Sequence, residues 1–248
     1  MNFKDKIIRL SEVDSTNAYA REILKKFPSI QEGTTIVAGF QTSGTGQDGK
    51  AWESHKEQNL LLSIIVHPDF LQPDQLFYLN ISIALAVFDF IESFYIKDSK
   101  IKWPNDIYVG NKKIAGLLIH NDLEFNRIRN SIIGIGININ QDNFNTDIPN
   151  PVSLKNILKK ETDVNVCLEN LLDYIENRYN MLKNKDFEKL FSQYHDALYL
   201  LGQETLFLDN KDEEFQGIID GVRSDGRIRI ITPQGIRFFE FREIRYIF

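Results

Sequence analysis

Residues 102–119, KWPNDIYVGNKKIAGLLI, carry the clearest structural signal in this chain. Two short apolar segments, Ile107–Val109 and Lys113–Ile119, flank a Gly110-Asn111 pair, which is typical of a β-hairpin. Just upstream, Pro104 removes a backbone donor and restricts the residue before it to extended conformations. We therefore expect a sheet that is interrupted at this proline and presents polar groups at its edge.

Outside this hairpin, helical and extended patterns alternate. Side-chain oxygens at Asp14, Ser15 and Thr16 can cap a helix, and apolar residues then recur at helical spacing until Pro28. Gln41–Ser54 is polar and glycine-rich, which indicates a long loop. The other predicted strands are Thr34–Phe40, Leu60–Val66 and Ser131–Asn140. Three further helices are predicted: a long one that begins at Pro73, and two that span Leu168–Leu182 and Phe187–Leu198.

The pattern changes after Leu201, where helical periodicity ends. The segments that follow are short, strand-like and separated by turn residues, which is typical of a small barrel. We predict that residues 201–248 form an SH3-like β-barrel and that residues 1–200 form a separate, larger domain. The predicted barrel strands are Thr205–Leu208, Phe215–Val222, Arg227–Ile231, Ile236–Phe239 and Ile244–Ile247.

Composition narrows the classes of function. The formal net charge is −6, and duplex-binding proteins usually carry a basic surface, so DNA is not a predicted partner. The single cysteine, Cys167, cannot form an intramolecular disulfide or a cysteine-rich metal site. The first residues, MNFKDKIIRL, lack an apolar signal-peptide core, and uninterrupted apolar runs are shorter than the roughly 20 residues that span a bilayer. We expect a cytoplasmic protein without a membrane partner.

The glycine-rich segment Gly44–Gly49 matches the G-x-G-x-x-G pattern of dinucleotide-binding folds. That interpretation is not favoured, because no helix opens after it and the next strand ends at His67-Pro68 without a carboxylate. Glycine-rich backbone can instead cradle an anion, and Trp52 offers a flat face for a purine. A plain surface loop beside a core tryptophan is the structural alternative.

Two further motifs are candidates for ligand contact. Lys112 and Lys113 precede a strand in which Gly116 leaves room for a ligand to approach the backbone. Gly134 and Gly136 alternate in another strand and so face one side of the sheet. The structural alternatives are a solvated hairpin and close packing of the sheet against a helix.

Together and in this order, the blocks Asp14–Asn17, Gln41–Trp52, Lys102–Asp106, Lys113–Gly116 and Gly134–Asn138 resemble the biotin–protein ligase family. The resemblance covers roughly residues 10–140, and its most specific part is KWPND followed by K-I-A-G. It implies an α+β fold, in which a mixed β-sheet flanked by helices, as in class II synthetases, carries the catalytic site. The implied enzyme converts biotin and ATP, with Mg²⁺, to biotinyl-5′-AMP and transfers biotin to a lysine of a biotin carboxyl carrier protein.

The resemblance also implies a role for each matching residue. Lys113 and Asp106 would be catalytic, with Lys113 at the carboxylate–phosphate region. The biotin ring would be bound by Ser15, Thr16, Asn17 and Gln41, and the loop that closes over the ligand would consist of Gly44, Thr45, Gly46 and Gln47. The nucleotide would be contacted by Trp52, Asn105, Asp106 and Asn138. The backbone would run close to the biotin tail at Gly116, Gly134 and Gly136.

This chain departs from the family pattern in the glycine-rich loop. The family often has arginine where this chain has Gln47, and often a basic residue at Thr45. Our hypothesis is that Lys50, Lys113 or the metal ion supplies the missing charge. The histidines His55, His67, His120 and His195 show no metal-ligand spacing, so no metal ligand is predicted.

Other interpretations stay open. A lipoate–protein ligase is the nearest alternative enzyme, and a catalytically weak biotin-binding or sensing module is the alternative outside enzymes. Repressor-type relatives carry an N-terminal winged-helix domain, for which this sequence has no room before Asp14, so no operator binding is expected. An exposed strand edge could pair two subunits into a homodimer.

Overall fold

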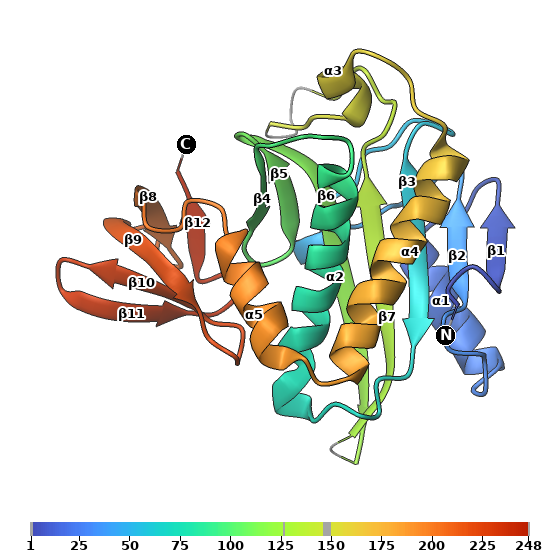
Figure 1. The fold of residues 1–248 in the computed structure, drawn as a ribbon, viewed down its shortest axis with the longest axis horizontal. Helices are drawn as coiled ribbons and strands as arrows, with labels where there is room; N and C mark the ends of the chain where they lie inside the picture. The colour runs from blue at the N-terminus through green and yellow to red at the C-terminus, as the bar shows by residue number, and fades with distance from the viewer. Residues whose placement is uncertain (1, 126, 146–149, 248) are drawn as a thin grey trace.

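The structure is a computed structural model that describes residues 2–125, 127–145 and 150–247. Its larger sheet has the strand order β1-β2-β3-β7-β6-β5-β4 (Figure 1). Strands β1 and β2 are parallel and the other neighbours are antiparallel, so the sheet is mixed. These strands are β1 (Ile7–Leu10), β2 (Thr35–Ala38), β3 (Leu60–Val66), β4 (Ser99–Lys102), β5 (Asp106–Val109), β6 (Lys112–Glu124) and β7 (Arg127–Ile137).

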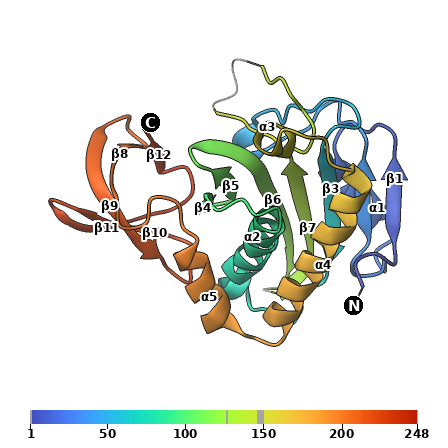
Figure 2. The same ribbon diagram turned by 45° about the horizontal axis from the view of Figure 1, so that its top comes forward.

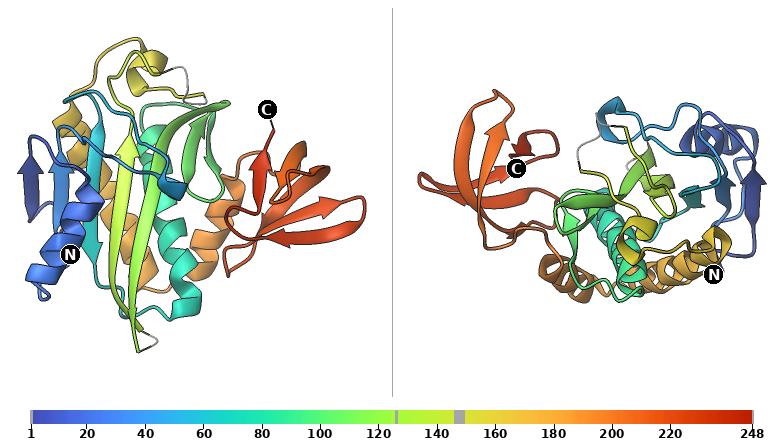
Figure 3. Two further views of the ribbon diagram at one scale, coloured as in Figure 1. Left: turned by 180° about the vertical axis from the view of Figure 1, so that it is seen from behind. Right: turned by 90° about the horizontal axis from the view of Figure 1, so that it is seen from above.

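Helices cover both faces of this sheet. Helices α2 and α4 lie on one face, and α1 lies on the other, as the view from behind shows (Figure 3). The helices are α1 (Thr16–Lys26), α2 (Leu76–Glu92), α3 (Leu154–Leu158), α4 (Val164–Lys183) and α5 (Phe187–Asp196), with short 3₁₀ turns η1 (Gln47–Gly49) and η2 (Pro73–Gln75). The predicted α+β fold with a mixed sheet flanked by helices is confirmed.

Local sequence explains where α1 begins and ends. Ser15 is its N-cap, and the Ser15 side chain accepts a hydrogen bond of 3.4 Å from the Ala18 amide. Lys25 and Lys26 occupy the last turn, where the helix dipole favours positive charge. Ala20 and other apolar residues of α1 pack against β2, β3 and β7. The capped start of α1 therefore lies directly over the sheet.

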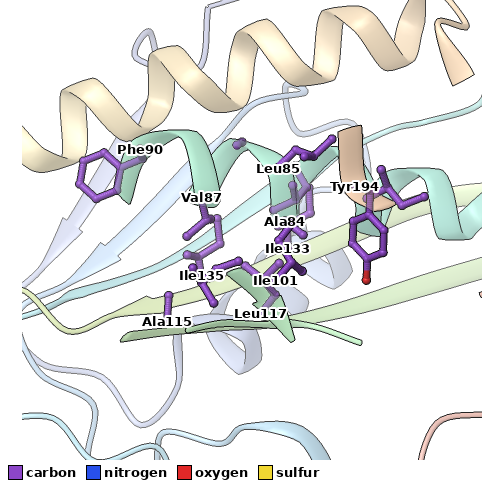
Figure 4. Close-up of a cluster of buried hydrophobic side chains, with 14 of the residues drawn as sticks. Ala84, Leu85, Val87, Phe90, Ile101, Ala115, Leu117, Ile133, Ile135 and Tyr194 are labelled. Carbon is purple, nitrogen blue, oxygen red and sulfur yellow. The ribbon is translucent and has the colours of Figure 1, made fainter. Parts of the chain in front are cut away.

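The main core lies between the sheet and α2. Ala84 and Val87 of α2 lie over Ile133 and Ile135 of the sheet (Figure 4). Pro73–Glu92 is long and apolar enough to cross a membrane, but 61% of its most apolar window is buried inside the protein. Each large apolar side chain buried in this way contributes about 1.5–3 kcal/mol. The helix is thus a core helix of the fold.

The C-terminal residues form a second sheet, entirely antiparallel, with the order β11-β10-β9-β8-β12. It lies beside α5 and the β4–β5 edge of the large sheet (Figure 2). Its strands are β8 (Glu204–Asp209), β9 (Glu214–Val222), β10 (Ile228–Thr232), β11 (Gly235–Phe239) and β12 (Ile244–Tyr246), which matches the predicted succession. We refer to residues 201–247 as the C-terminal unit; the domain boundary at residue 200 stays a prediction.

Some elements differ from the sequence prediction. The sequence patterns did not indicate β1, β4 or α3, which are all short. Strands β6 and β7 are longer than predicted and reach Glu124 and Arg127 at a solvent-exposed hairpin tip. Polar residues on both faces of that tip hide the alternation on which strand prediction rests. Asp163 caps α4, which begins at Val164 rather than at Leu168.

Candidate functional site

A cavity of about 600 Å³ lies on the sheet face opposite α2. Ile133 and Ile135 of β7 face α2, so the alternating residues Gly134 and Gly136 face the cavity. It is lined by Ser15, Thr16, Asn17, Gln41, Thr45, Gly46, Gln47, Lys50, Ala51, Trp52, Glu53, Leu62, Lys102, Asn105, Asp106, Tyr108, Lys113, Gly116, Leu117, Leu118, Gly134, Ile135, Gly136, Asn138, Phe144, Asn145 and Pro151.

Every predicted site residue except Gly44 lines this cavity. Gly44 is buried, and a Cβ atom there would lie 2.8 Å from Gln41 Nε2 and 3.1 Å from the Trp52 carbonyl oxygen. A glycine is therefore required there to let the loop backbone pass close to Gln41, and Gly44 itself contributes packing.

Strand register arranges the cavity floor in two rows. Ser63, Gly134 and Leu118 are neighbours across β3, β7 and β6. The next row on the same face runs from Gly136 through Gly116, Asp106 and Lys102, across β7, β6, β5 and β4. The rows are two residues apart, roughly 7 Å along β7.

Hydroxyl and amide groups gather over the first row. Gln41 Oε1 accepts hydrogen bonds from the Thr16 amide (2.8 Å) and the Thr16 hydroxyl (3.0 Å). The buried Ser63 hydroxyl lies 2.7 Å from Thr16 Oγ1 and 2.6 Å from Asn17 Oδ1. Asn17 Nδ2 donates to the Leu118 carbonyl at 3.2 Å. The start of α1 thus forms a polar cluster with fixed orientations.

Charged and aromatic groups gather over the second row. Lys113 Nζ lies 2.7 Å from Asp106 Oδ1 and 5.5 Å from the centre of a Trp52 ring. The indole covers Gly136 so closely that a Cβ there would lie 2.5 Å from Trp52 Cε2. Trp52 Nε1 is buried and, among the described residues, has no hydrogen-bond partner. This indole can therefore offer a donor to a bound ligand.

Three lysines line the cavity, of which the motif analysis gave Lys102 no role. Burial lowers the pKa of Lys102 to about 8, the positive charges of Lys113 and Lys50 act in the same direction, and Asp106 opposes them. The three lysines outnumber the two carboxylates of the lining, Asp106 and Glu53, and create a potential that attracts an anion.

The glycine-rich loop folds back on itself beside the cavity. The Gly46 amide donates to the Lys50 carbonyl at 2.7 Å, and the Trp52 amide donates to the Gly44 carbonyl at 2.9 Å. The 3₁₀ turn η1 at Gln47–Gly49 completes the reversal. This geometry brings Gln47 and Lys50 to the same cavity as Trp52.

Two asparagines predicted to contact nucleotide also support the main chain. Asn105 Nδ2 donates to the Leu117 carbonyl, and Asn138 Nδ2 donates to the Val152 carbonyl at 3.1 Å. Both residues line the cavity, but these side-chain nitrogens already bond to backbone. Their contact with a nucleotide stays a prediction.

Sequence reasoning missed several residues of the site. Ser63 is the one polar residue in LLLSIIV, the buried strand β3, and such an exception is a signal that could have been used. Lys102 was visible within KWPND, whereas Tyr108, Phe144 and Asn145 follow no motif that distinguishes them. Only folding brings those three to the cavity.

A mixed sheet with a polar cluster and three lysines around one cavity defines a protein that binds an anionic small molecule. The chain belongs to the biotin/lipoate A/B protein ligase family, whose family model matches residues 10–138.

Named relatives agree with that family. The bifunctional ligase/repressor BirA of Bacillus spizizenii is 31% identical over 230 residues, which cover 91% of this chain and 69% of the relative. The biotin–[acetyl-CoA-carboxylase] ligase of Mycobacterium tuberculosis is 24% identical, with 88% and 80% of the two chains covered. Among solved structures, the biotin protein ligase of Aquifex aeolicus in complex with biotin and ATP superposes with a TM-score of 0.81 at 29% identity, covering 98% of this chain and 99% of that one.

Proposed function

We propose that this chain is an ATP-dependent biotin–protein ligase. In the first step a biotin carboxylate oxygen bonds to the α-phosphorus of ATP, and pyrophosphate leaves. In the second step an acceptor lysine amine attacks the carbonyl of biotinyl-5′-AMP, an amide forms, and AMP and a proton leave. The acceptor is a biotin carboxyl carrier protein. The named relatives and the ligands of the Aquifex aeolicus structure support this assignment.

The observation that carries the proposal is the pairing of two chemistries in one cavity. Neutral donors and acceptors at Thr16, Asn17 and Gln41 suit a ureido ring, while Lys113 and Trp52 suit a phosphate and a purine. Carboxylate and polyphosphate repel each other, so their reaction requires fixed positive groups at the reacting atoms. Lys113, held by Asp106, can provide such a group.

The mixed anhydride product must also be kept from water. The loop around Gln47 folds beside the cavity, and closing it over the adenylate would exclude water until the acceptor lysine arrives. Lys50 of the same loop supports the hypothesis that another cation replaces the arginine expected at Gln47.

Mg²⁺ is part of the proposal, and the residues present fit it. The described residues hold no group of three or more histidine, cysteine or acidic side chains that could form a dedicated metal cage. Mg²⁺ in nucleotide sites usually takes one or two carboxylates, with water and substrate phosphates as its other ligands. Asp106 offers one carboxylate in the cavity, and the ion would neutralise charge on the departing pyrophosphate.

The remaining assignments are also proposals. The enzyme acts in the cytoplasm, residues 1–200 form its catalytic domain, and DNA is not a partner. Pairing of two subunits through an exposed strand edge would give a homodimer. A salt-sensitive, sequence-specific gel shift would contradict the absence of DNA binding. Sedimentation analysis tests whether the protein forms a homodimer.

A lipoate–protein ligase is the second candidate, because the family includes lipoate ligases. The dithiolane ring of lipoate has no strong hydrogen-bonding groups to satisfy the cluster around Thr16 and Gln41. That cluster favours biotin. A catalytically weak biotin-binding module is the third candidate, because Gln47 stands where the family often has arginine.

The test is mass spectrometry of an apo biotin carboxyl carrier domain incubated with the protein, biotin and MgATP. We expect one biotin per carrier, none without ATP, and none on a carrier whose acceptor lysine is arginine. Pyrophosphate release should depend on biotin and not on lipoate. Release with lipoate alone would support the second candidate, and tight biotin binding without ATP consumption would support the third.

A further inference from the structure

The C-terminal unit holds the end of β4 beside the cavity. Trp103 is buried, and its Nε1 donates to the Gly226 carbonyl of the C-terminal unit at 2.9 Å. Its ring centre also lies 5.3 Å from that of Phe241. Lys102, the residue before Trp103, is therefore fixed to the C-terminal unit through its neighbour.

The ammonium group of Lys102 lies between two tyrosines. It donates to Tyr108 Oη at 3.1 Å, and its nitrogen lies 4.8 Å from the centre of that ring. From the other unit, the Tyr246 ring centre lies 4.7 Å from the same nitrogen. Tyr246 belongs to β12 and packs edge-on against Phe207 of β8. The last strand of the chain thus contributes an aromatic wall around a lysine of the cavity.

Aromatic faces attract an ammonium group and restrict where it lies. A lysine has a flexible four-carbon stem, and ordering it costs rotamer entropy that must otherwise be overcome when a ligand binds. Lys102 belongs to the same row as Asp106, Gly116 and Gly136, over which Trp52 and Lys113 lie. The ordered positive charge of Lys102 therefore lies at the end of the cavity that we assign to the nucleotide.

We propose that Tyr246 is a positioning residue that holds Lys102 ready for the phosphates of the nucleotide, so that the C-terminal unit takes part in nucleotide binding. This inference rests on the proposed function. It predicts that a substitution at Tyr246 weakens ATP binding by way of Lys102 and leaves biotin binding unchanged.

The experiment measures the KM for ATP, kcat and the Kd for biotin in the full chain. Tyr246→Leu should raise the KM for ATP about threefold to tenfold, with a smaller change in kcat, and Tyr246→Phe should stay within about twofold of wild type. Phe238→Leu is the matched control. Phe238 belongs to β11, at the opposite edge of the same sheet, and its ring lies 5.0 Å from the Arg223 guanidinium. Its loss should leave all three constants unchanged.

A double-mutant cycle tests whether Tyr246 acts through Lys102. In a Lys102→Met background, Tyr246→Leu should have no further effect on the KM for ATP. Independent effects of the two substitutions, an equal loss in Tyr246→Phe, or a weaker Kd for biotin would overturn the inference. A wild-type protein without biotin-dependent pyrophosphate release would instead overturn the proposed function.

A measurement on the wild-type protein covers the case in which Tyr246→Leu does not fold. With isotope-labelled lysine, the ε-methylene protons of Lys102 should resonate upfield because of the two aromatic ring currents, and Lys102→Met assigns that signal. A Lys102 signal at the ordinary lysine position would overturn the inference.

Discussion

Lys113 Nζ lies 2.7 Å from Asp106 Oδ1, across neighbouring strands and against the ring of Trp52. The two side chains are about 30% and 22% exposed, so the pair is largely shielded from solvent. A lysine held in this way needs little reorganisation when negative charge develops on a phosphate.

Lys113→Met should therefore slow biotinyl-AMP formation about 100-fold or more, since removing one preorganised charge typically costs roughly 3 kcal/mol. Single-turnover quench measurements check this rate. Lys183→Met is the control, because Lys183 also carries its charge beside aromatic rings but does not line the cavity. A change below about threefold in Lys113→Met would contradict the assigned role.

Gly134 and Gly136 provide a matched pair of substitutions along β7. A Cβ at Gly134 would lie 2.6 Å from the Asn17 amide, whereas one at Gly136 would lie 2.5 Å from the Trp52 indole. Either contact forces the neighbour to move, and overpacking of this kind costs about 1–3 kcal/mol. Gly134→Ala should raise the KM for biotin about tenfold, and Gly136→Ala should raise that for ATP similarly.

Each alanine variant is the control for the other. In steady-state kinetics, Gly134→Ala should change the KM for ATP little, and Gly136→Ala should change the KM for biotin little. Equal effects of both variants on both substrates would indicate general distortion of β7 and would remove support for separate biotin and nucleotide ends.

Gln47 and Lys50 lie in the same loop, and both line the cavity. If Lys50 supplies charge that Gln47 lacks, Lys50→Gln should slow single-turnover adenylate formation about tenfold, and Gln47→Arg should change it little. A large gain of rate in Gln47→Arg would show that the glutamine is a deficit. Filter assays of released biotinyl-AMP then tell whether retention, rather than formation, is affected.

The burial of Lys102 predicts a pH dependence. Because its pKa is lowered to about 8, Lys102 is charged below that pH and becomes neutral as the pH rises through it. The KM for ATP should accordingly increase above about pH 8. This increase should be absent in Lys102→Met and should move to higher pH in Lys102→Arg, since arginine stays protonated. A flat profile in wild type would exclude a charged Lys102 from nucleotide binding.

The sequence by itself determined the local elements and the order of the motifs. Caps, turn residues and apolar spacing act between near neighbours, so the start of α1 at Ser15, the apolar strand β3 and the short C-terminal strands could be predicted. The KWPND and K-I-A-G blocks identified the family because their residue order is specific.

Only the tertiary structure decided how these segments meet. Strand register places Lys102, Asp106 and Gly136 in one row, and no local pattern specifies register between distant strands. Short strands such as β1 and β4 gain stability from pairing rather than from their own residues, which is why sequence patterns missed them. The approach of Tyr246 to Lys102 likewise depends on how the second sheet packs beside the first, a long-range contact that residue order does not reveal.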